Sequence, residues 1–510
     1  MDIKGVASYD ANSIIRQLKA KKSAFFTRER EKRSLKLFKE AARRVPAYKD
    51  FLRKNKVNPA KIKTFKDFEG LPITSKKDYL KKYPLEKLSW DGSLKKPLVF
   101  TSTSGSTGEP FYFPRGQQLD WQYSILAEEF LKNSSYGTGG PTLVIIGFGM
   151  GVWIGGIITY KAFEIAAQNN NLPISIITPG INKGEIFHAL RNLSTQYKET
   201  ILVGYPPFIK DVIDEAPTQG INLKKLNLRL LFAAEAFNEK FRDYLVKKTG
   251  IKNPYLDTLN IYGTADIGAM AYETPLSILI RRLATKNKDL FMDIFGDIAK
   301  TPTLAQYNPF FMNFEAPNGE IVLTGDNTIP LIRYSIGDHG GAMTFDEINE
   351  KLATNKINLN KETKTAGISN RISQKPFVYV YERKDLSTTL YGLQIYPETV
   401  REVLLDDPHG KHLTGKFSMM TKFDKKHNQY LEINLELKKG KKQNARLKKH
   451  LNNIIILNLR SKISEFKELN NFLGRRSHPK IVFWPHEHPK HFKPGIKQKW
   501  VKKQTKKRKK

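Results

Sequence analysis

The sequence has no cysteine among its 510 residues and is poor in acidic residues, with 50 Asp and Glu against 86 Lys and Arg. The absence of cysteine excludes a disulfide framework, thiolate zinc sites, iron–sulfur clusters and a catalytic thiol. Any metal ion must therefore be held by oxygen or histidine ligands. The net charge of +36 favours solubility and attraction to anions, but it specifies no fold.

The positive charge is mostly lysine spread along the chain, and it is dense only in the run KKQTKKRKK at 502–510. This pattern is typical of a solvated basic surface, and a polyanion partner is the alternative interpretation. We expect no specific nucleic-acid partner.

Long uncharged runs are also scarce. The segment PTLVIIGFGMGVWIGGIITY at 141–160 has the length of ~20 residues that a bilayer requires, but it is rich in glycine. It predicts a buried strand, a glycine turn and a core helix, and no membrane span. The first ten residues lack the basic and apolar regions of a signal peptide, so we expect a cytoplasmic protein.

The pattern of apolar residues predicts an α/β protein with two domains. Residues 13–56 have apolar positions at helical spacing, which indicates an amphipathic helical lead-in. Beyond that, short apolar runs alternate with loops and with helical stretches such as 184–197 and 238–248, which indicates parallel strands. A second alternation, with a helix near 441–461, predicts a small α+β domain. The expected divisions are a lead-in packed on the large domain (1–95), the rest of the large domain (96–382), the small domain (383–500) and a basic tail (501–510).

The strongest local motif is TSTSGSTGEP at 101–110, directly after the strand-like PLVF. Its glycines permit close approach of the backbone, and its hydroxyl groups can donate to phosphate oxygens. It is not a Walker A loop, because Glu109 follows Gly108 where that motif requires lysine. The residues that we expect to hold phosphate are Thr103, Ser104, Gly105, Ser106, Thr107 and Gly108.

Further motifs also lie where strands run into loops, which is where ligands gather in α/β sheets. Taken alone, Glu235 in FAAEAF could cap a helix and Asp338 in YSIGDHGG could cap a turn. The other motifs are NIYGTADIGA at 260–269, YERKDLSTTLYGLQ at 381–394 and HFKPGIKQKW at 491–500.

In this order, and together with the lead-in segments ARRVPAYKDFL and FEGLPITSKKDYLKKYP, the motifs resemble the adenylate-forming superfamily. The chain is most similar to the phenylacetate-CoA ligase-like branch, over roughly residues 35–500. The resemblance implies a large N-terminal domain and a mobile C-terminal domain. It also implies that ATP activates a carboxylic acid as an acyl-adenylate and that a thiol then takes the acyl group. Coenzyme A is the expected acceptor, a phosphopantetheine carrier protein is the alternative, and the chain could be a monomer or a homodimer.

The resemblance assigns the nucleotide contacts to particular residues. Glu235 lines the adenine pocket, Tyr262 with Gly263 stacks on adenine, and Asp338 and Arg383 bind the ribose hydroxyls. Asp266 stands where the family has a glutamate that holds Mg²⁺ on the ATP phosphates, so it is both a metal ligand and a catalytic residue. Ala265 replaces a residue with a hydroxyl group, which is a departure from the family.

The resemblance also assigns the second domain its roles. Asp385 matches the hinge, and Lys497 matches the catalytic lysine of adenylation, with Lys499 as the alternative. Phe148, Trp153 and Tyr205 are candidates for the acid pocket and suggest an apolar or aromatic acid. Core packing explains the same aromatic residues equally well.

Two other functions remain open at this point. A degenerate scaffold that binds polyanions would fit the net charge and the departures at Ala265 and Asp266. A dinucleotide-dependent oxidoreductase could use GFGMG at 147–151, but 168–171 carries no acidic residue for the ribose. The histidine-rich HEHPKH at 486–491 predicts a solvated turn more than a metal site.

Overall fold

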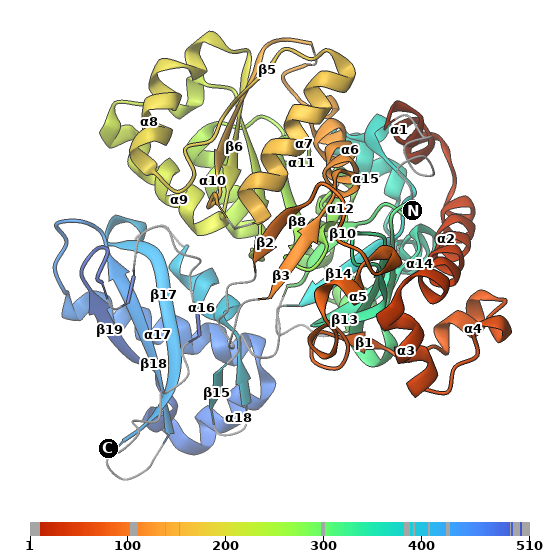
Figure 1. Cartoon of the computed structure of the whole chain (residues 1–510). Coiled ribbons are helices and arrows are strands. Elements are labelled where there is room, and N and C mark those ends of the chain that lie inside the picture. Colours follow the sequence, from red (N-terminus) through yellow and green to blue (C-terminus); the bar gives the residue numbers. More distant parts are fainter. Residues whose placement is uncertain are drawn as a thin grey trace.

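The computed structural model describes most of the chain as a large part that carries the N-terminus and a smaller C-terminal part (Figure 1). The large part is a mixed α/β structure, and the smaller part combines a short sheet with helices, as the sequence predicts. The described residues are 11–102, 111–137, 139–151, 154–296, 301–381, 388–390, 393–405, 409–424, 429–489, 491–492 and 500–501.

The predicted helical lead-in is confirmed, and it consists of several helices. A break separates the second from the third, because Val45 is extended and Pro46 starts the next helix. Phe38 and Tyr48 are buried in one core cluster with Tyr334 of the central sheet. The lead-in is therefore part of the large domain. Its helices are α1 (Ala11–Ala20), α2 (Ser23–Arg44), α3 (Pro46–Lys54), α4 (Phe65–Glu69) and α5 (Leu85–Leu88).

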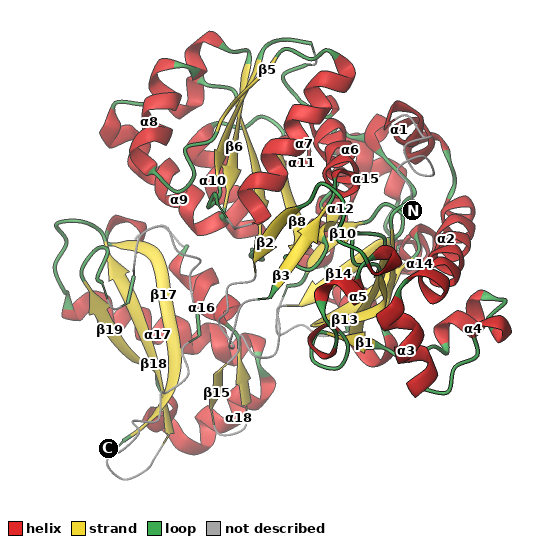
Figure 2. Cartoon of the chain, viewed as in Figure 1, coloured by secondary structure: helices red, strands yellow, loops and turns green. Residues whose placement is uncertain are grey.

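A central sheet forms the core of the large part, with helices on both sides (Figure 2). Its strands from β4 to β8 are parallel, and the others are mostly antiparallel. The strand order is β11 (Met312–Glu315), β12 (Glu320–Gly325), β13 (Leu331–Met343), β14 (Phe377–Tyr381), β10 (Thr303–Gln306), β9 (Gly268–Tyr272), β8 (Thr258–Thr264), β7 (Leu228–Ala233), β6 (Glu199–Gly204), β4 (Thr142–Gly147) and β5 (Ile174–Ile177), with β1 (Thr74–Ser75) beside β13. A separate pair comprises β2 (Val99–Ser102) and β3 (Tyr112–Arg115).

The parallel half of the sheet is buried on both faces. Leu143 and Ile145 of β4 contact the cluster formed with α8, α9 and α10, whereas Val144 and Ile146 contact α6 and α7. This alternation follows from the two-residue period of a strand. The helices of the large part are α6 (Gln117–Lys132), α7 (Ile154–Asn170), α8 (Lys183–Asn192), α9 (Pro206–Glu215), α10 (Glu239–Thr249), α11 (Pro254–Asp257), α12 (Pro275–Lys286), α13 (Lys288–Phe295), α14 (Phe345–Thr354) and α15 (Leu359–Thr365).

The uncharged segment 141–160 forms the buried strand β4 and the start of the core helix α7, as predicted. Of the helices that the structure describes, none combines the length and the apolar character needed to cross a bilayer.

The C-terminal part has its own apolar core, in which β17 and β18 pack against α16 and α17. Phe417 and Leu459 lie in this core and are fully buried. The last strand, β19, pairs in parallel with β18. The elements are β15 (Thr388–Leu390), β16 (Leu393–Ile395), α16 (Pro397–Leu404), β17 (Leu413–Phe423), β18 (Gln429–Leu437), α17 (Ala445–Lys462), α18 (Ser464–Leu473) and β19 (Lys480–Trp484).

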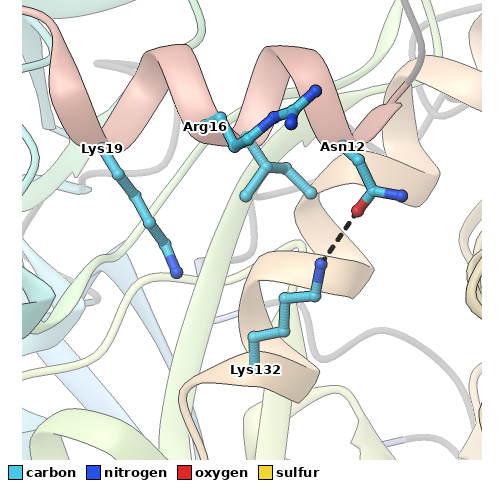
Figure 3. Close-up of a pocket in the computed structure, with 5 residues that line it drawn as sticks. Asn12, Arg16, Lys19 and Lys132 are labelled. Atoms are coloured by element: carbon cyan, nitrogen blue, oxygen red, sulfur yellow. Dashed lines mark hydrogen bonds between the residues drawn. The ribbon is translucent and has the colours of Figure 1, made fainter.

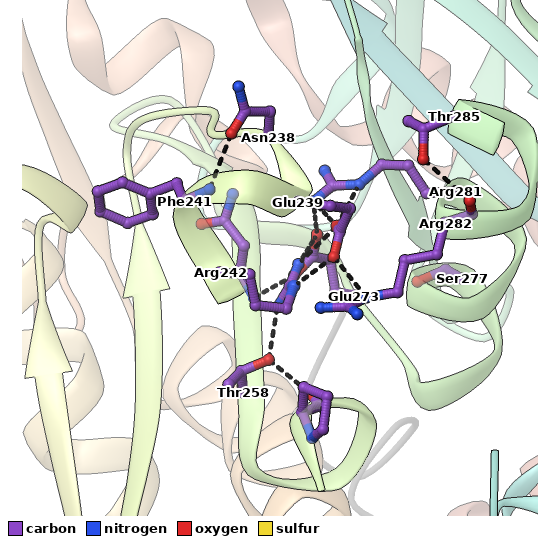
Figure 4. A network of polar contacts seen from close by, with 12 residues as sticks. Asn238, Glu239, Phe241, Arg242, Thr258, Glu273, Ser277, Arg281, Arg282 and Thr285 are labelled. Atoms are coloured by element: carbon purple, nitrogen blue, oxygen red, sulfur yellow. Dashed lines mark hydrogen bonds and ion pairs between the residues drawn. The ribbon is translucent and has the colours of Figure 1, made fainter. Parts of the chain in front are cut away.

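A buried network of charged residues ties α10, α12 and the end of β9 together (Figure 4). Glu239 pairs with Arg242, Arg281 and Arg282, and Glu273 pairs with Arg242 at 2.7 Å. Burial alone would raise the pKa of Glu239, but the three guanidinium groups lower it below the ordinary value. Each of the two carboxylates has at least two hydrogen-bonding partners.

We predict that the variant Glu239→Gln lowers the free energy of unfolding by about 3–5 kcal/mol, because it leaves buried guanidinium groups without their carboxylate. Urea unfolding followed by circular dichroism measures the change. Glu40→Gln, which breaks a more exposed pair with Arg43, serves as the control and should cost less than about 1 kcal/mol. Equal stability of the two variants would contradict the prediction.

Candidate functional site

The loop after β7 carries Glu235 in a constrained position. The preceding residue, Ala234, has φ of 73°, a left-handed conformation that costs a non-glycine residue about 1–3 kcal/mol. The carbonyl oxygen of Glu235 accepts a hydrogen bond from Asn260 Nδ2 at 3.2 Å. Asn238, not Glu235, caps the following helix α10, since its Oδ1 accepts from the backbone N–H of Phe241. The helix-cap interpretation of Glu235 is therefore wrong.

The buried network of Glu239, Glu273 and their arginine partners also stabilises the Glu235 loop. Glu273 Oε2 accepts a hydrogen bond from the backbone N–H of Asn260 at 3.0 Å, in addition to its contacts with Arg242. Asn260 in turn donates to Glu235. The buried charges thus position the Glu235 loop through one strand residue of β8.

Tyr262 and Asp338 come from separate motifs and meet in the structure. Tyr262 lies on β8 and its O–H donates to Asp338 Oδ2 of β13 at 2.7 Å. Asp338 is half-buried within the strand, so it does not serve only as a turn cap. Next to Tyr262, a Cβ atom on Gly263 would stand 2.8 Å from the carbonyl oxygen of Gly268, which explains the glycine there.

Asp266 lies in the turn between β8 and β9, and both of its carboxylate oxygens have partners. Oδ2 accepts from the Tyr334 hydroxyl at 2.5 Å, and Oδ1 pairs with Lys76 Nζ at 3.2 Å. The Asp266 side chain is only 11% exposed, whereas Lys76 is 34% exposed. Because the Lys76 side chain is the more exposed of the two, it can move toward a ligand more easily than Asp266 can.

Neither Lys76 nor Tyr334 is among the site residues predicted from the sequence. Lys76 follows the short strand β1, which pairs in parallel with β13 so that Thr74 lies opposite Tyr334. Both residues are within motifs quoted above, but only this pairing brings them to Asp266. The signal in the sequence was a lysine that follows the segment Leu71–Ser75 in the lead-in.

A single carboxylate such as Asp266 suits Mg²⁺, which is typically held by one or two carboxylates together with phosphate oxygens and water. No group of three or more His, Asp or Glu side chains that could hold a metal occurs among the described residues. The remaining ligands of a metal ion here would therefore come from substrate phosphate and water. Around HEHPKH, the indole of Trp484 instead stacks on His491, with ring centroids 3.9 Å apart.

The aromatic candidates for an acid pocket are packed against each other. Phe148 is 1% exposed, and its ring meets that of Tyr205 edge-on at 4.9 Å. Burial raises the pKa of the half-buried Tyr205, and the nearby Glu235 carboxylate raises it further. Tyr205 thus lies close to the Glu235 loop, whereas Phe148 lies behind it in the core.

The C-terminal part contacts the large part close to this loop. Trp500 Nε1 donates to Glu235 Oε2 at 2.9 Å, and Arg401 donates to the carbonyl oxygen of Ala236 at 2.6 Å. Further along, Lys416 of β17 pairs with Asp211 of α9 at 2.5 Å. The two parts are therefore joined by polar contacts between largely buried groups.

Several of the predicted site residues lie outside the described residues, and their roles stay predictions. They are Thr103, Ser104, Gly105, Ser106, Thr107, Gly108, Trp153, Arg383, Asp385 and Lys497. Among the described residues, the structure brings together Glu235, Tyr262, Asp266 and Asp338 around the ends of β7 and β8 and the facing part of β13.

Some of the positive charge gathers in a basic hollow of about 470 Å³ between α1 and α6 (Figure 3). Arg16 and Lys19 of α1 line it with Lys132, which donates to Asn12 at 3.2 Å. Burial, with a contribution from Arg371, lowers the pKa of Lys19. None of the candidate site residues lines this hollow.

Comparison with known proteins gives a consistent result. No family model matches the chain. Phenylacetate-coenzyme A ligase of Thermus thermophilus is 21% identical over 382 residues, which cover 74% of this chain and 75% of that protein. The structure of 2-hydroxyisobutyryl-CoA ligase in the postadenylation state, with R3-HIB-AMP, aligns at a TM-score of 0.65 and 15% identity, over 96% of this chain and 92% of that one.

The chain has the fold of the adenylate-forming ligases. This confirms the fold and the family resemblance that the motifs predict. The same 2-hydroxyisobutyryl-CoA ligase in its thioesterification state, with 2-HIB-AMP and CoA, aligns at a TM-score of only 0.52 and 16% identity, over 96% of this chain and 91% of that one. The chain therefore aligns better with the postadenylation structure than with the thioesterification structure.

Proposed function

We propose that the chain is an ATP-dependent ligase that activates a carboxylic acid as an acyl-adenylate and transfers the acyl group to the thiol of coenzyme A. The observation that carries the proposal is the meeting of three separate motifs at one site. Glu235 accepts a hydrogen bond from Asn260, Asp338 accepts one from Tyr262, and Asp266 accepts one from Tyr334. The relatives named above are acyl-CoA ligases, which supports the same reaction class.

The nucleoside would be held by the Tyr262–Asp338 pair and the Glu235 loop. The Asp338 carboxylate would accept hydrogen bonds from the ribose hydroxyls, with Arg383 as a second ribose contact. The hydrogen bond from Tyr262 fixes the orientation of Asp338 before the nucleotide binds, which lowers the entropic cost of binding. The ring of Tyr262 would stack on adenine.

The phosphates would lie between the glycine-rich loop, Lys76 and Asp266. The loop from Thr103 to Gly108 would donate N–H and O–H groups, and Lys76 would move from Asp266 onto a phosphate oxygen. Asp266 would hold Mg²⁺, which supplies positive charge that neutralises the phosphate oxygens. Lys497 would stabilise the charge that develops during transfer.

The proposed chemistry has two steps. An oxygen of the substrate carboxylate attacks the α-phosphorus, the bond to the bridging oxygen breaks, and pyrophosphate leaves. The sulfur of coenzyme A then attacks the acyl carbon, its proton passes to solvent, and AMP leaves with the electron pair of the broken bond. The main task of the protein in both steps is to position the reactants and to neutralise charge.

The contacts between the large part and the C-terminal part suit the first step, which is adenylate formation. In the structure, Trp500 and Arg401 hold the C-terminal part against the Glu235 loop. We propose that rotation about Asp385 exchanges this arrangement for one that admits the thiol. The Asp211–Lys416 pair would then form in the first arrangement and break in the second.

We predict that Lys416→Met slows adenylate formation about 10- to 100-fold, because Asp211 is left buried without its cation when the two parts dock. Thioester formation from supplied acyl-adenylate should not slow. Rapid-quench measurement of each half-reaction tests this.

The matched control is Lys422→Met on the same strand, since Lys422 pairs with Glu432 inside the C-terminal part. It should leave both half-reactions within about twofold of wild type. Equal slowing by both variants would contradict a role for the Asp211–Lys416 contact in docking.

The proposed function is tested by product analysis with purified protein, ATP, Mg²⁺ and a panel of carboxylic acids. We expect AMP and an acyl-CoA thioester to appear in equal amounts, and only when ATP, an acid and coenzyme A are all present. Adenylate formation with transfer to a carrier protein, and not to coenzyme A, would move the assignment to the alternative acceptor. ATP turnover independent of any acid would contradict the proposal.

A further inference from the structure

A second pocket, of about 250 Å³, lies between α2, α6 and the β11–β12 edge of the central sheet. It shares no lining residue with the candidate site. In Figure 1, α2 lies on the side of the large part that faces away from the C-terminal part. Apolar side chains, including Leu37, Trp90 and Phe310, form much of its wall. At ~30 Å³ for each water molecule, the pocket has the space of about eight waters.

One end of this pocket offers hydrogen-bond donors. Arg30 donates through one guanidinium nitrogen to Asn313 Oδ1 at 3.0 Å. Arg30 Nε and Asn313 Nδ2 are buried and have no hydrogen-bond partner, and Asn313 is only 2% exposed. Within the described part of the chain, no carboxylate forms an ion pair with Arg30. The end therefore suits the carboxylate of a ligand.

The other end offers acceptors. Asp326 Oδ2 accepts from Gln118 Nε2 at 2.9 Å, whereas Asp326 Oδ1 and Gln122 Oε1 are buried without a partner. Asp326 is 9% exposed and Gln122 is 8% exposed. Of the cationic side chains that the structure describes, none forms an ion pair with Asp326, and burial raises its pKa. A buried carboxylate without a counter-cation suits the positively charged end of a ligand.

The two ends are close enough for one small molecule. Asn313 lies opposite Thr324 in the β11–β12 register. Asp326 is two residues beyond Thr324, so the Cα atoms of Thr324 and Asp326 are on the order of 7 Å apart. Unpaired buried donors and acceptors are costly, so a group of them around one cavity indicates a missing partner. The partner must combine an anionic end, a cationic end and an apolar surface.

We propose that this pocket binds a free α-amino acid with an apolar side chain. Its carboxylate would accept from Arg30 and Asn313, and its ammonium group would donate to Asp326 and Gln122. Its side chain would contact the apolar wall. This site is separate from the one that would bind ATP and goes beyond the proposed function.

The test is isothermal titration calorimetry on the full chain with L-leucine and L-phenylalanine. N-acetyl-leucine, which lacks the ammonium group, and leucinamide, which lacks the carboxylate, are the matched ligands. We expect the free amino acids to bind and each derivative to bind about 10- to 100-fold more weakly, which is the effect of losing a charge-assisted hydrogen bond. This series uses the wild-type protein and does not depend on the folding of any variant.

Variants place the binding in this pocket. Asn313→Asp gives Arg30 an internal carboxylate, and Asp326→Asn removes the charge opposite the ammonium group. Both should weaken binding about 10-fold or more and keep pyrophosphate exchange activity. Arg16→Ala, in the basic hollow, should leave binding unchanged.

The proposal is overturned by any of three results. These are no binding of any standard amino acid at millimolar concentration, equal affinity for leucine and its two derivatives, or undiminished binding in both pocket variants. A crystal structure grown with leucine that shows only water in the pocket would overturn it as well. Amino acids bound as substrates at the candidate site would still bind to the pocket variants, so the two sites can be told apart.

Discussion

Replacement of Asp338 by alanine is expected to raise the KM for ATP about 100-fold or more. In the proposed complex this carboxylate accepts hydrogen bonds from both ribose hydroxyls. Hydrogen bonds to a charged group contribute about 1.5–3 kcal/mol each, and every ~1.4 kcal/mol corresponds to a factor of ten. ATP–pyrophosphate exchange at varied ATP concentration measures the change.

Two controls separate ribose binding from general damage to the site. Tyr262→Phe removes the O–H that donates to Asp338 but keeps the carboxylate, so we expect an increase in KM of about tenfold or less. Deoxy-ATP should be a poorer substrate than ATP for the wild-type protein but not for Asp338→Ala. An unchanged KM for ATP in Asp338→Ala would show that this carboxylate does not bind the ribose.

Replacement of Lys497 by alanine should slow adenylate formation about 100- to 1,000-fold and leave thioester formation from supplied acyl-adenylate unchanged. The lysine would stabilise charge on the transferring phosphoryl group, and loss of one such electrostatic contact typically costs this much. After the small domain rotates, the same residue would no longer contact the reacting atoms. Single-turnover assays of the two half-reactions measure both effects.

Lys499→Ala is the matched control, because Lys499 lies two residues away in the same basic segment. It should change either half-reaction by less than about threefold, as expected for a lysine that does not contact the reacting groups. A larger loss in Lys499→Ala than in Lys497→Ala would transfer the assignment to Lys499. Equal loss of both half-reactions in Lys497→Ala would contradict a role limited to adenylation.

Local patterns in the sequence predict much of the fold. The run Leu143–Ile146 and the helical segment after it form β4 and α7, because burial on both faces of a parallel strand requires a continuous apolar run. The amphipathic lead-in is confirmed because its apolar residues recur at helical spacing and bury one face, as Phe38 of α2 does. Local patterns could not predict the pairing of β1 with β13, because it joins Thr74 to Tyr334, which is far away in the sequence.

The candidate site was predicted only in part, and through the family resemblance more than through local physics. The resemblance pointed to Tyr262, Asp266 and Asp338, and the structure places these residues together. It did not point to Lys76 or Trp500, because their contacts depend on how distant segments pack. The acceptors and donors of the second pocket have no signature in the sequence at all.

The measurement that tests the account most directly is ATP–pyrophosphate exchange across a panel of aliphatic and aromatic carboxylic acids. The account predicts that at least one acid supports exchange, and that Asp338→Ala strongly slows this exchange at ATP concentrations that just saturate the wild-type protein. The absence of exchange with every acid, together with tight binding of polyanions, would contradict it. That result would favour a scaffold that has kept the adenylate-forming fold without its chemistry.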